Sequence, residues 1–509
     1  MRKYILIILS IIILPLCLFS QQNPIRVEIN WNSNEEPFLI APCGNNGVML
    51  FYSVKNQIDK NSLLWTFTHY DKNLTKIWTK TFAIHHDNKF QKYFYSDGIL
   101  YVAFFNEEKS KTENNFELLV IDFVKEKINN YKGNLPQNTA FSSMAIADNK
   151  AFIGLTASKN INAFFMLSLH DSTWKAIDPD IKLEREIESV QWDSINKEIL
   201  IVKKSFVKRD PSISITVFDT NGNLSAQIPL EYNNTDVEIN SADVIATGSR
   251  QYLITGTFTF TNSKKSEIQE ENAEDASGFY SVMYNQGAWD TLRYYNWASL
   301  SDNNSFNLTE DAIKNKIKNN NKRKQSKNNN YNIVKHPLIK YHNAYLLIAE
   351  AFYPEYHTER SLVYDYFGRP MTNTYSVFDG YRYSNGFILC FDKNGELLWD
   401  NGIEMWNILT LDIQKKLNIS IDGDEIALAF SNEGKIAYKV CRGNEVIDNM
   451  SFTSIDALMS QDEIIEESSS VMQKWYGKYY LVSGYQKIRN NAMAENRRGV
   501  FYINKIAFE

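Results

Sequence analysis

Short apolar strands recur along this chain at a nearly constant spacing. Each has about seven mainly apolar residues, and most follow a turn pair such as Asn-Gly or Asp-Gly. Eight such strands begin at Val48, Ile99, Ala151, Ile199, Tyr252, Tyr345, Ile426 and Tyr479. Five of the seven intervals lie between 48 and 53 residues, and the other two, 93 and 81, contain insertions. A repeat of this length with several strands is typical of a β-propeller blade.

The module around Ile99 has four strand patterns in order. One such sheet cannot bury both faces alone, whereas a ring of packed sheets can. The last module runs out before its fourth strand, and the alternating segment Ile25 to Trp31 could pair there. We therefore predict an all-β fold, a β-propeller of eight four-stranded blades closed by the N-terminal strand. The alternatives are seven blades, a pair of β-sandwiches or an unclosed array.

One hairpin phrase recurs within the modules. Asp392 to Trp399, "DKNGELLW", aligns without a gap with Asp71 to Trp78, "DKNLTKIW". Phe218 to Leu224 is a third copy, and Phe430 to Ile436 is a looser fourth. Asp or Asn closes such a turn with its side chain, and Asn or Gly accepts a left-handed backbone. The phrase therefore predicts a tight hairpin at each position.

The stretch "FILCFDKNGELLWDNGI", residues 387–403, resembles the blade repeat of the quinoprotein-like propellers. That family includes quinone-dependent dehydrogenases and non-enzymatic scaffolds of the outer-membrane assembly machinery, and its Trp docks between blades. The resemblance implies a fold and not a chemistry, because this Trp is a docking residue and no catalytic motif of the family is legible. The Trp is missing after Asp219 and Asn432, so the match is partial there. The whole chain also resembles uncharacterised secreted proteins of Gram-negative bacteria, from which no activity carries over.

The N-terminus has the pattern of a secretory signal peptide. Met1 to Lys3 is basic, Tyr4 to Phe19 is apolar, and Ser20 precedes a cleavage point. We predict a signal peptide over 1–20 and a single propeller domain over 21–509. An uncleaved anchor and a lipoprotein cut before Cys17 are the alternatives. The mature protein is expected beyond the inner membrane, in the periplasm, on the outer-membrane surface or secreted.

Composition narrows the classes of function. A net charge of -6 over 509 residues argues against a dedicated nucleic-acid binder. Aromatic residues make up 14%, which favours β structure and broad contact surfaces. Beyond the signal peptide, Cys43, Cys390 and Cys441 allow at most one internal disulfide, and no CxxC or zinc spacing is present. Cys390 and Cys441 lie in apolar strand patterns and are expected to be buried.

Two polar insertions interrupt the repeat. Residues 263–277 are acidic and predict an exposed hairpin tip. Residues 308–332 open like a helix, with Thr309 as the N-cap, and continue as a Lys/Asn-rich segment that predicts a solvated loop. The alternative is a contact with an anionic surface, such as lipopolysaccharide or phosphate head groups, through Lys314 to Lys327.

A third insertion, residues 352–383, lies between the second and third strands of the sixth module. Its interleaved Tyr and Arg residues are typical of interface hot spots. The candidate binding residues are Tyr353, Tyr356, Arg360, Tyr364, Tyr366, Arg369, Tyr381 and Arg382. The expected partner is an envelope or extracellular protein or a glycan. The alternative is a self-packed loop that caps the propeller mouth.

Catalytic and metal-binding patterns are sparse. His85, His86 and Asp87 are adjacent, and neighbouring side chains on a strand point to opposite faces, so we expect no metal site there. Glu355, His357 and Glu359 alternate and could hold a cation, although a solvated polar edge is favoured. The sequence has no GxSxG elbow, HExxH helix or P-loop. We predict no catalytic residue and no cofactor.

These patterns favour a non-catalytic, exported binding or scaffold module. The alternative is a propeller-type hydrolase or lyase that acts on an extracellular glycan or peptide. Paired carboxylates facing a central funnel would favour the enzyme, whereas a flat aromatic patch at one mouth would favour the binding module.

Overall fold

The computed structural model describes residues 25–31, 37–59, 61–106, 114–177, 182–207, 210–232, 236–261, 274–297, 300, 331–364, 367–459, 461–492 and 496–507. These ranges contain β-strands, one 3-10 turn, η1 (Gly44–Asn46), and no α-helix. None of their helical segments is long and apolar enough to cross a membrane. The predicted all-β class is confirmed. The predicted signal peptide over 1–20 lies outside the described residues.

The first half of the chain forms four consecutive strand units. The first unit is β2 (Leu39–Pro42), β3 (Val48–Asp59), β4 (Ser62–Tyr70) and β5 (Lys76–His85). The second is β6 (Lys89–Ser96), β7 (Ile99–Phe105), β8 (Asn114–Asp122) and β9 (Lys127–Leu135). The third is β10 (Thr139–Ala147), β11 (Lys150–Ala157), β12 (Phe164–Ser168) and β13 (Trp174–Ala176). The fourth is β14 (Glu184–Asp193), β15 (Glu198–Val207), β16 (Asp210–Asp219) and β17 (Leu224–Pro229), joined to the third by the pair Ala157–Arg185.

Two larger sheets follow. The fifth unit is β18 (Val237–Ile239), β19 (Asp243–Gly248), β20 (Gln251–Phe260), β22 (Gly278–Asn285), β23 (Ala288–Trp289) and β24 (Arg293–Asn296). The sixth is β21 (Glu274–Ala276), β25 (Tyr331–Lys335), β26 (Ile339–Tyr341), β27 (Ala344–Tyr364), β28 (Pro370–Phe391), β29 (Leu397–Glu404) and β30 (Leu409–Thr410).

The C-terminal part of the chain forms the last two units. The seventh unit is β31 (Asn418–Asp422), β32 (Glu425–Asn432), β33 (Lys435–Arg442) and β34 (Glu445–Ser454). The last unit is β35 (Glu463–Lys474), β36 (Tyr479–Arg489), β37 (Arg497–Ala507) and the N-terminal strand β1 (Ile25–Asn30). β1 pairs antiparallel with β37 from Ile25–Lys505 to Asn30–Val500, as the alternation of Ile25 to Trp31 predicted.

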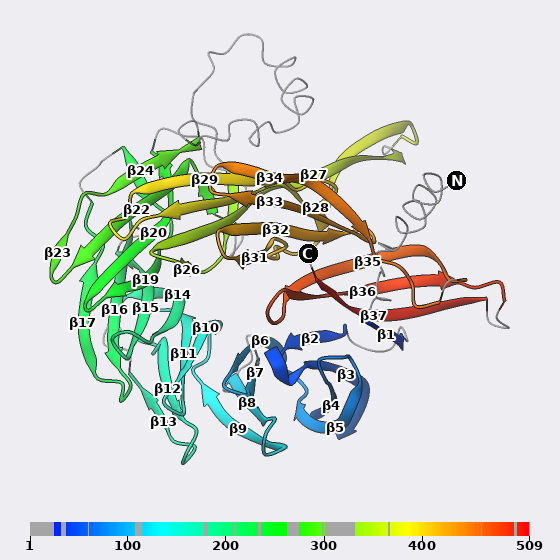
Figure 1. The fold of residues 1–509 in the computed structure, drawn as a ribbon, viewed down its shortest axis with the longest axis horizontal. Coiled ribbons are helices and arrows are strands. Elements are labelled where there is room, and N and C mark those ends of the chain that lie inside the picture. Colours follow the sequence, from blue (N-terminus) through cyan, green and yellow to red (C-terminus); the bar gives the residue numbers. More distant parts are fainter. Residues whose placement is uncertain are drawn as a thin grey trace, which may run out of the picture.

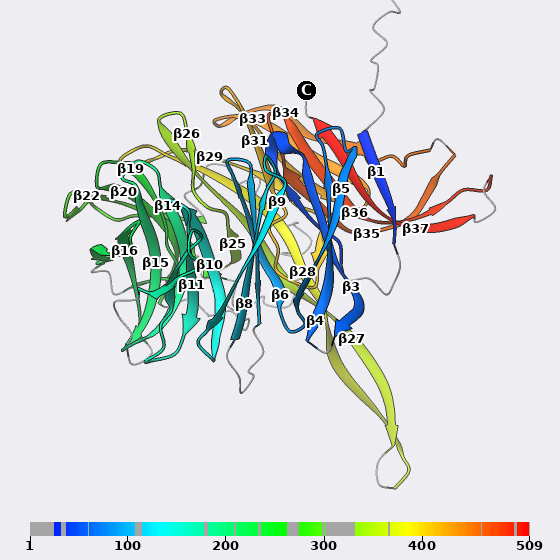
Figure 2. The same cartoon turned by 90° about the horizontal axis from the view of Figure 1, so that it is seen from below.

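The units follow one another around a centre, which is the arrangement of a β-propeller (Figures 1 and 2). The apolar core is divided into several clusters in the same way. Separate clusters of buried side chains lie between one unit and the next, such as Phe51 and Phe104 between the first and second units. Another cluster joins the last unit to the first through Phe38, Leu50 and Phe501. All eight predicted apolar strands are present, as β3, β7, β11, β15, β20, β27, β32 and β36, and each lies in one of these cores.

The hairpin phrase forms the same turn three times. In each copy one aspartate oxygen accepts two backbone N–H groups at 2.8 Å, from Asn73 and Thr75 to Asp71, from Asn221 and Asn223 to Asp219, and from Asn394 and Glu396 to Asp392. These turns join β4 to β5, β16 to β17 and β28 to β29. At the fourth copy the predicted tight hairpin also forms, as a two-residue turn from Asn432 to Lys435, but it joins β32 to β33 and is not equivalent to the other three.

The polar insertions are shorter than predicted. Of residues 263–277, the last few belong to the fold, because β21 pairs with β25 and Ala276 and Ser277 are buried. Most of residues 308–332, including Thr309 and Lys314 to Lys327, lie outside the described residues, but β25 begins at Tyr331. The three cysteines of the described chain are buried free thiols, as expected for Cys390 and Cys441.

Candidate functional site

The third insertion continues the two strands that flank it. β27 and β28 run past the rest of their sheet and form a two-stranded ribbon, here called the arm, residues 353–364 and 367–380. Beyond the contact of β28 with β30 at Tyr381 and Arg382, the arm strands pair, among the described residues, only with each other. Figure 2 shows the arm projecting from the body. The insertion is therefore an extended hairpin, and the predicted alternative of a loop folded over the mouth is wrong.

A row of aromatic rings anchors the arm. Phe352 and Tyr381 are buried in the core, with ring centroids 5.6 Å apart. Tyr381 contacts Phe378 at 5.0 Å, and Phe378 contacts Tyr356 at 5.5 Å. Exposure rises along the row, from 2% at Tyr381 to 56% at Tyr356. The row therefore fixes the base of the arm and presents aromatic area to solvent further out.

The opposite face of the arm carries a polar network. The imidazole of His357 lies between two carboxylates, with Nδ1 2.5 Å from Asp379 Oδ1 and Nε2 3.3 Å from Glu359 Oε1. Tyr375 donates its hydroxyl to Glu359 at 2.6 Å. The hydrogen bond to Asp379, followed by that to Glu359, raises the pKa of His357. Asp379 and Glu359 bind different ring nitrogens of His357. The alternating residues Glu355, His357 and Glu359 therefore form a cross-strand network and do not converge on a cation site.

The predicted binding residues divide into two groups. Tyr353 and Tyr356 are 41% and 56% exposed, and Arg360 and Arg369 are also exposed on the arm. Arg382 is held at the base by an ion pair with Glu355, and this hydrogen bond raises the pKa of Arg382.

Of the other three predicted residues, one is buried and two are not tested. Tyr381 is buried, because it packs between Phe352 and Phe378. Tyr364 is placed only by its backbone in β27, and Tyr366 lies outside the described residues. The sequence reasoning missed apolar residues of the arm that are at least two-fifths exposed: Leu362, Val363 and Met371. Alternation did not mark them, because Leu362 and Val363 are adjacent; their place within the insertion was the available signal.

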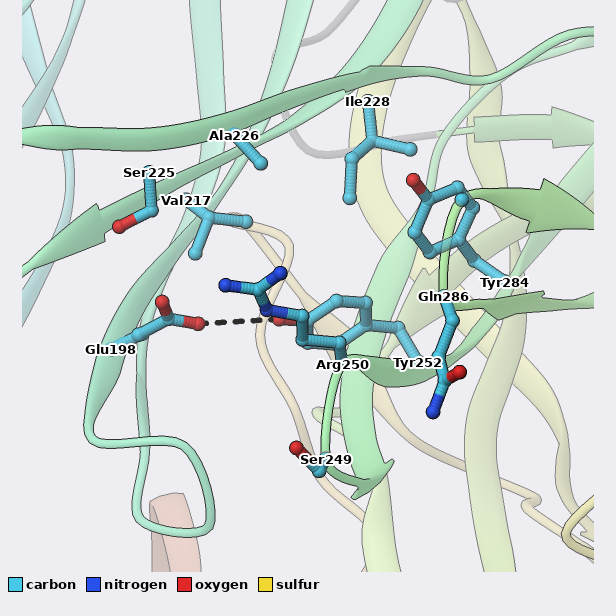
Figure 3. Close-up of a pocket in the computed structure, with 11 residues that line it drawn as sticks. Glu198, Val217, Ser225, Ala226, Ile228, Ser249, Arg250, Tyr252, Tyr284 and Gln286 are labelled. Atoms are coloured by element: carbon cyan, nitrogen blue, oxygen red, sulfur yellow. Dashed lines mark hydrogen bonds between the residues drawn. The ribbon is translucent and has the colours of Figure 1, made fainter.

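A pocket of about 550 Å³ lies between the fourth and fifth units. Figure 3 shows Tyr252 and Tyr284 in it, with the apolar side chains of Ala226 and Ile228 at one side. The tyrosine rings stack with centroids 6.3 Å apart, and Tyr252 donates its hydroxyl to Glu198 Oε2 at 3.3 Å. Burial and the nearby carboxylate raise the pKa of Tyr252. The volume is within the range of small-molecule sites, and no sequence pattern indicated this pocket.

No protein-family model and no curated protein sequence matches the chain. Among solved structures, the chain is similar to the β-propeller domain of the Trilobed protease from Pyrococcus furiosus, at 8% identity over 83% of this chain and 95% of that chain, with a TM-score of 0.34. A prolyl endopeptidase is 11% identical over 91% and 54%, with a TM-score of 0.36. The Nup133 β-propeller domain of Vanderwaltozyma polyspora is 10% identical over 82% and 100%, with a TM-score of 0.32. This chain thus spans about half of the endopeptidase, and TM-scores this low carry no conclusion about function.

Proposed function

We propose that this protein is a non-catalytic binding or scaffold propeller that engages a protein or glycan through its arm. The observation that carries the proposal is the exposure of Tyr356, Arg360, Leu362 and Phe367 on a ribbon anchored in the core. Exposed apolar surface of this kind is unfavourable in water unless a partner covers it. Aromatic and Arg side chains contribute most to the affinity of protein interfaces.

The proposal includes an eight-bladed ring closed by β1. It is supported by the cluster that joins the last unit to the first and by hydrogen bonds across the same junction. Trp475 donates its indole N–H to Gly47 O at 2.9 Å, and Phe38 N donates to Tyr485 Oη at 2.7 Å. A closed ring gives the arm a rigid base. A kinship with the quinoprotein-like propellers remains a prediction from the hairpin phrase.

The enzyme alternative, a hydrolase or lyase, would need free carboxylates facing the centre. Two buried candidates have structural partners instead. Asp243 accepts N–H groups from Val244 and from Leu338 of the next unit, at 2.9 and 2.8 Å. Glu350 accepts the N–H groups of Lys416 and Leu417 of the next unit, each at 3.0 Å. These carboxylates hold units together, which favours the binding module.

The predicted signal peptide extends the proposal to a place outside the inner membrane, in the periplasm, at the outer-membrane surface or in the medium. The Lys/Asn-rich segment from Lys314 to Lys327 would add an anionic-surface contact there. Its test is binding to lipopolysaccharide or anionic vesicles, which deletion of the segment should weaken.

Site-specific photo-crosslinking tests the arm. A photoreactive residue at position 356 should capture a partner from envelope extracts, whereas the same residue at Ile447, an exposed position on β34, should not. The variant Tyr356→Ala, Arg360→Ala, Arg369→Ala should lose the partner with little change in melting temperature. Equal crosslinking at both positions, or loss of fold in the triple variant, would contradict the proposal.

A further inference from the structure

His85, His86 and Asp87 stand where β5 ends and the chain turns toward β6. The expectation that their side chains point to opposite faces is wrong, because the strand stops at His85 and the next two residues form a turn. One ligand atom from each of the three residues lies within 4.8 Å of the other two. Two imidazoles and a carboxylate thus converge on one point of the surface.

The separations suit a bound ion. His86 Nε2 lies 2.7 Å from Asp87 Oδ1, and His85 Nδ1 lies 3.8 Å from Asp87 Oδ2. Two ligands of a tetrahedral ion, each about 2.0–2.1 Å from the metal, are about 3.3 Å apart. The two observed distances, which involve different oxygens of Asp87, lie on either side of this value. Coordination through His85 Nδ1 would replace the long hydrogen bond that this atom accepts from Asp87 N at 3.4 Å, with rotation of the side chains toward one ion.

The backbone of the cluster is fixed in advance. His85 N donates to Glu117 Oε1 at 2.7 Å, and His86 N donates to Asn61 O at 2.9 Å. Asn88 N closes the turn on His85 O at 3.0 Å. Glu117 is buried and belongs to the second unit, so the turn is clamped between two units. A ligand set held in this way loses little conformational entropy on binding.

We propose that His85, His86 and Asp87 bind a divalent transition-metal ion of the Zn²⁺ class through two imidazoles and one carboxylate. Imidazole nitrogen favours Zn²⁺, Ni²⁺ and Cu²⁺, whereas Ca²⁺ and Mg²⁺ prefer oxygen ligands. The three side chains are 30–37% exposed, so an ion reaches them from solvent. The fourth coordination position is open to water or to a group on a partner.

Isothermal titration with ZnCl₂ at pH 7.5, on the full chain without an affinity tag, tests the site. One ion per chain should bind, and Co²⁺ should give the visible absorption of a nitrogen- and oxygen-ligated ion. His86→Ala should weaken Zn²⁺ binding at least about 100-fold, since even outer-shell changes cost 10–100-fold. Titration at pH 5 should weaken it too, because protons compete for the imidazoles.

The matched control is His357→Ala on the arm, which removes a histidine that also contacts carboxylates but lies outside the cluster. It should leave Zn²⁺ binding unchanged. His86→Gln, with the melting temperature measured alongside, separates loss of a ligand from loss of fold. Absence of stoichiometric binding, retention of affinity in both His86 variants, or loss of binding in His357→Ala would overturn the proposal.

Discussion

At the scale of single residues, local chemistry was readable from the sequence. Asp71, Asp219 and Asp392 close similar turns because a carboxylate accepts the backbone N–H two residues further along the chain, whatever the surrounding sheet does. The His85–Asp87 cluster was misread for the opposite reason. Its geometry depends on where β5 ends, and strand ends are set by pairing with β4, which no single residue reveals.

Removing the carboxylate of one of these turns should have a measurable cost. Asp392→Ala leaves the amides of Asn394 and Glu396 without their acceptor and should lower the free energy of unfolding by about 1–2 kcal/mol. Urea denaturation followed by tryptophan fluorescence measures it. Asp392→Asn keeps one acceptor oxygen and should lose less; an equal loss in both variants would contradict the role assigned to the turn.

Leu74 occupies the left-handed position that Gly395 takes in the equivalent turn, with φ of 59° against 79°. Its side chain is 3% exposed in the cluster between the last and first units. Leu74→Gly should relieve about 1 kcal/mol of backbone strain but lose about 2–5 kcal/mol of packing, so the variant should be less stable. A Leu74→Gly protein with a higher denaturation midpoint would show that strain outweighs packing here.

The buried thiols should be unreactive in the folded protein. Burial raises the pKa of Cys390 to about 12 and that of Cys441 to about 11, so almost no thiolate is present at neutral pH. Ellman's reagent should label the native protein slowly and the urea-unfolded protein at once. Rapid labelling of either residue at pH 7, identified by mass spectrometry, would contradict its burial.

At the scale of elements, the sequence located the arm but not its form. Aromatic and Arg composition indicated a contact surface, and the interval between modules placed it between two strands. That these strands continue outward as a ribbon depends on cross-strand contacts such as Tyr356–Phe378 and Glu359–Tyr375, whose register is not visible in either strand alone.

The polar face of the arm should respond to pH. The pKa of His357 is raised in the folded chain, so its stabilising ion pair is fully present below the unfolded pKa of about 6.5 and is lost as pH rises through the folded pKa. Proton NMR of the His357 ring should give a higher pKa in the wild type than in Asp379→Asn. Identical titration curves would mean that the imidazole does not contact Asp379 in solution.

At the scale of the whole molecule, the spacing of the sequence repeat is also the spacing of hydrogen bonds between neighbouring units. Side chains of one unit bond to the next unit at offsets of 52 or 54 residues: Gln191 to Asp243, Asn196 to Gly248, Ala242 to Glu188, Lys416 to Ser470 and Asn418 to Met472. The spacing was predictable from the apolar strands. The residues that make the contacts were not, because each junction uses a different polar pair.

Deleting residues 25–31 should destabilise all units together, because it exposes the edge of β37 and opens the cluster at the last junction. A lower melting temperature with dye binding to exposed apolar surface is the expected result. The control is deletion of residues 314–327, which should leave the melting curve unchanged, since Lys/Asn runs bury no core. Equal melting of the two deletion variants would mean that β1 is dispensable.

The pairing of β1 with β37 also orders events in time. A ribosome makes Ile25 among the first residues of the fold and Lys505 among the last, so β1 has no partner while the units between them form. Joining ends so distant in sequence carries a large loop-closure entropy unless the intervening units have already folded and brought them near. A chain whose synthesis stops before β37 would therefore leave β1 unpaired. Such an open strand edge exposes a protein to proteases and aggregation.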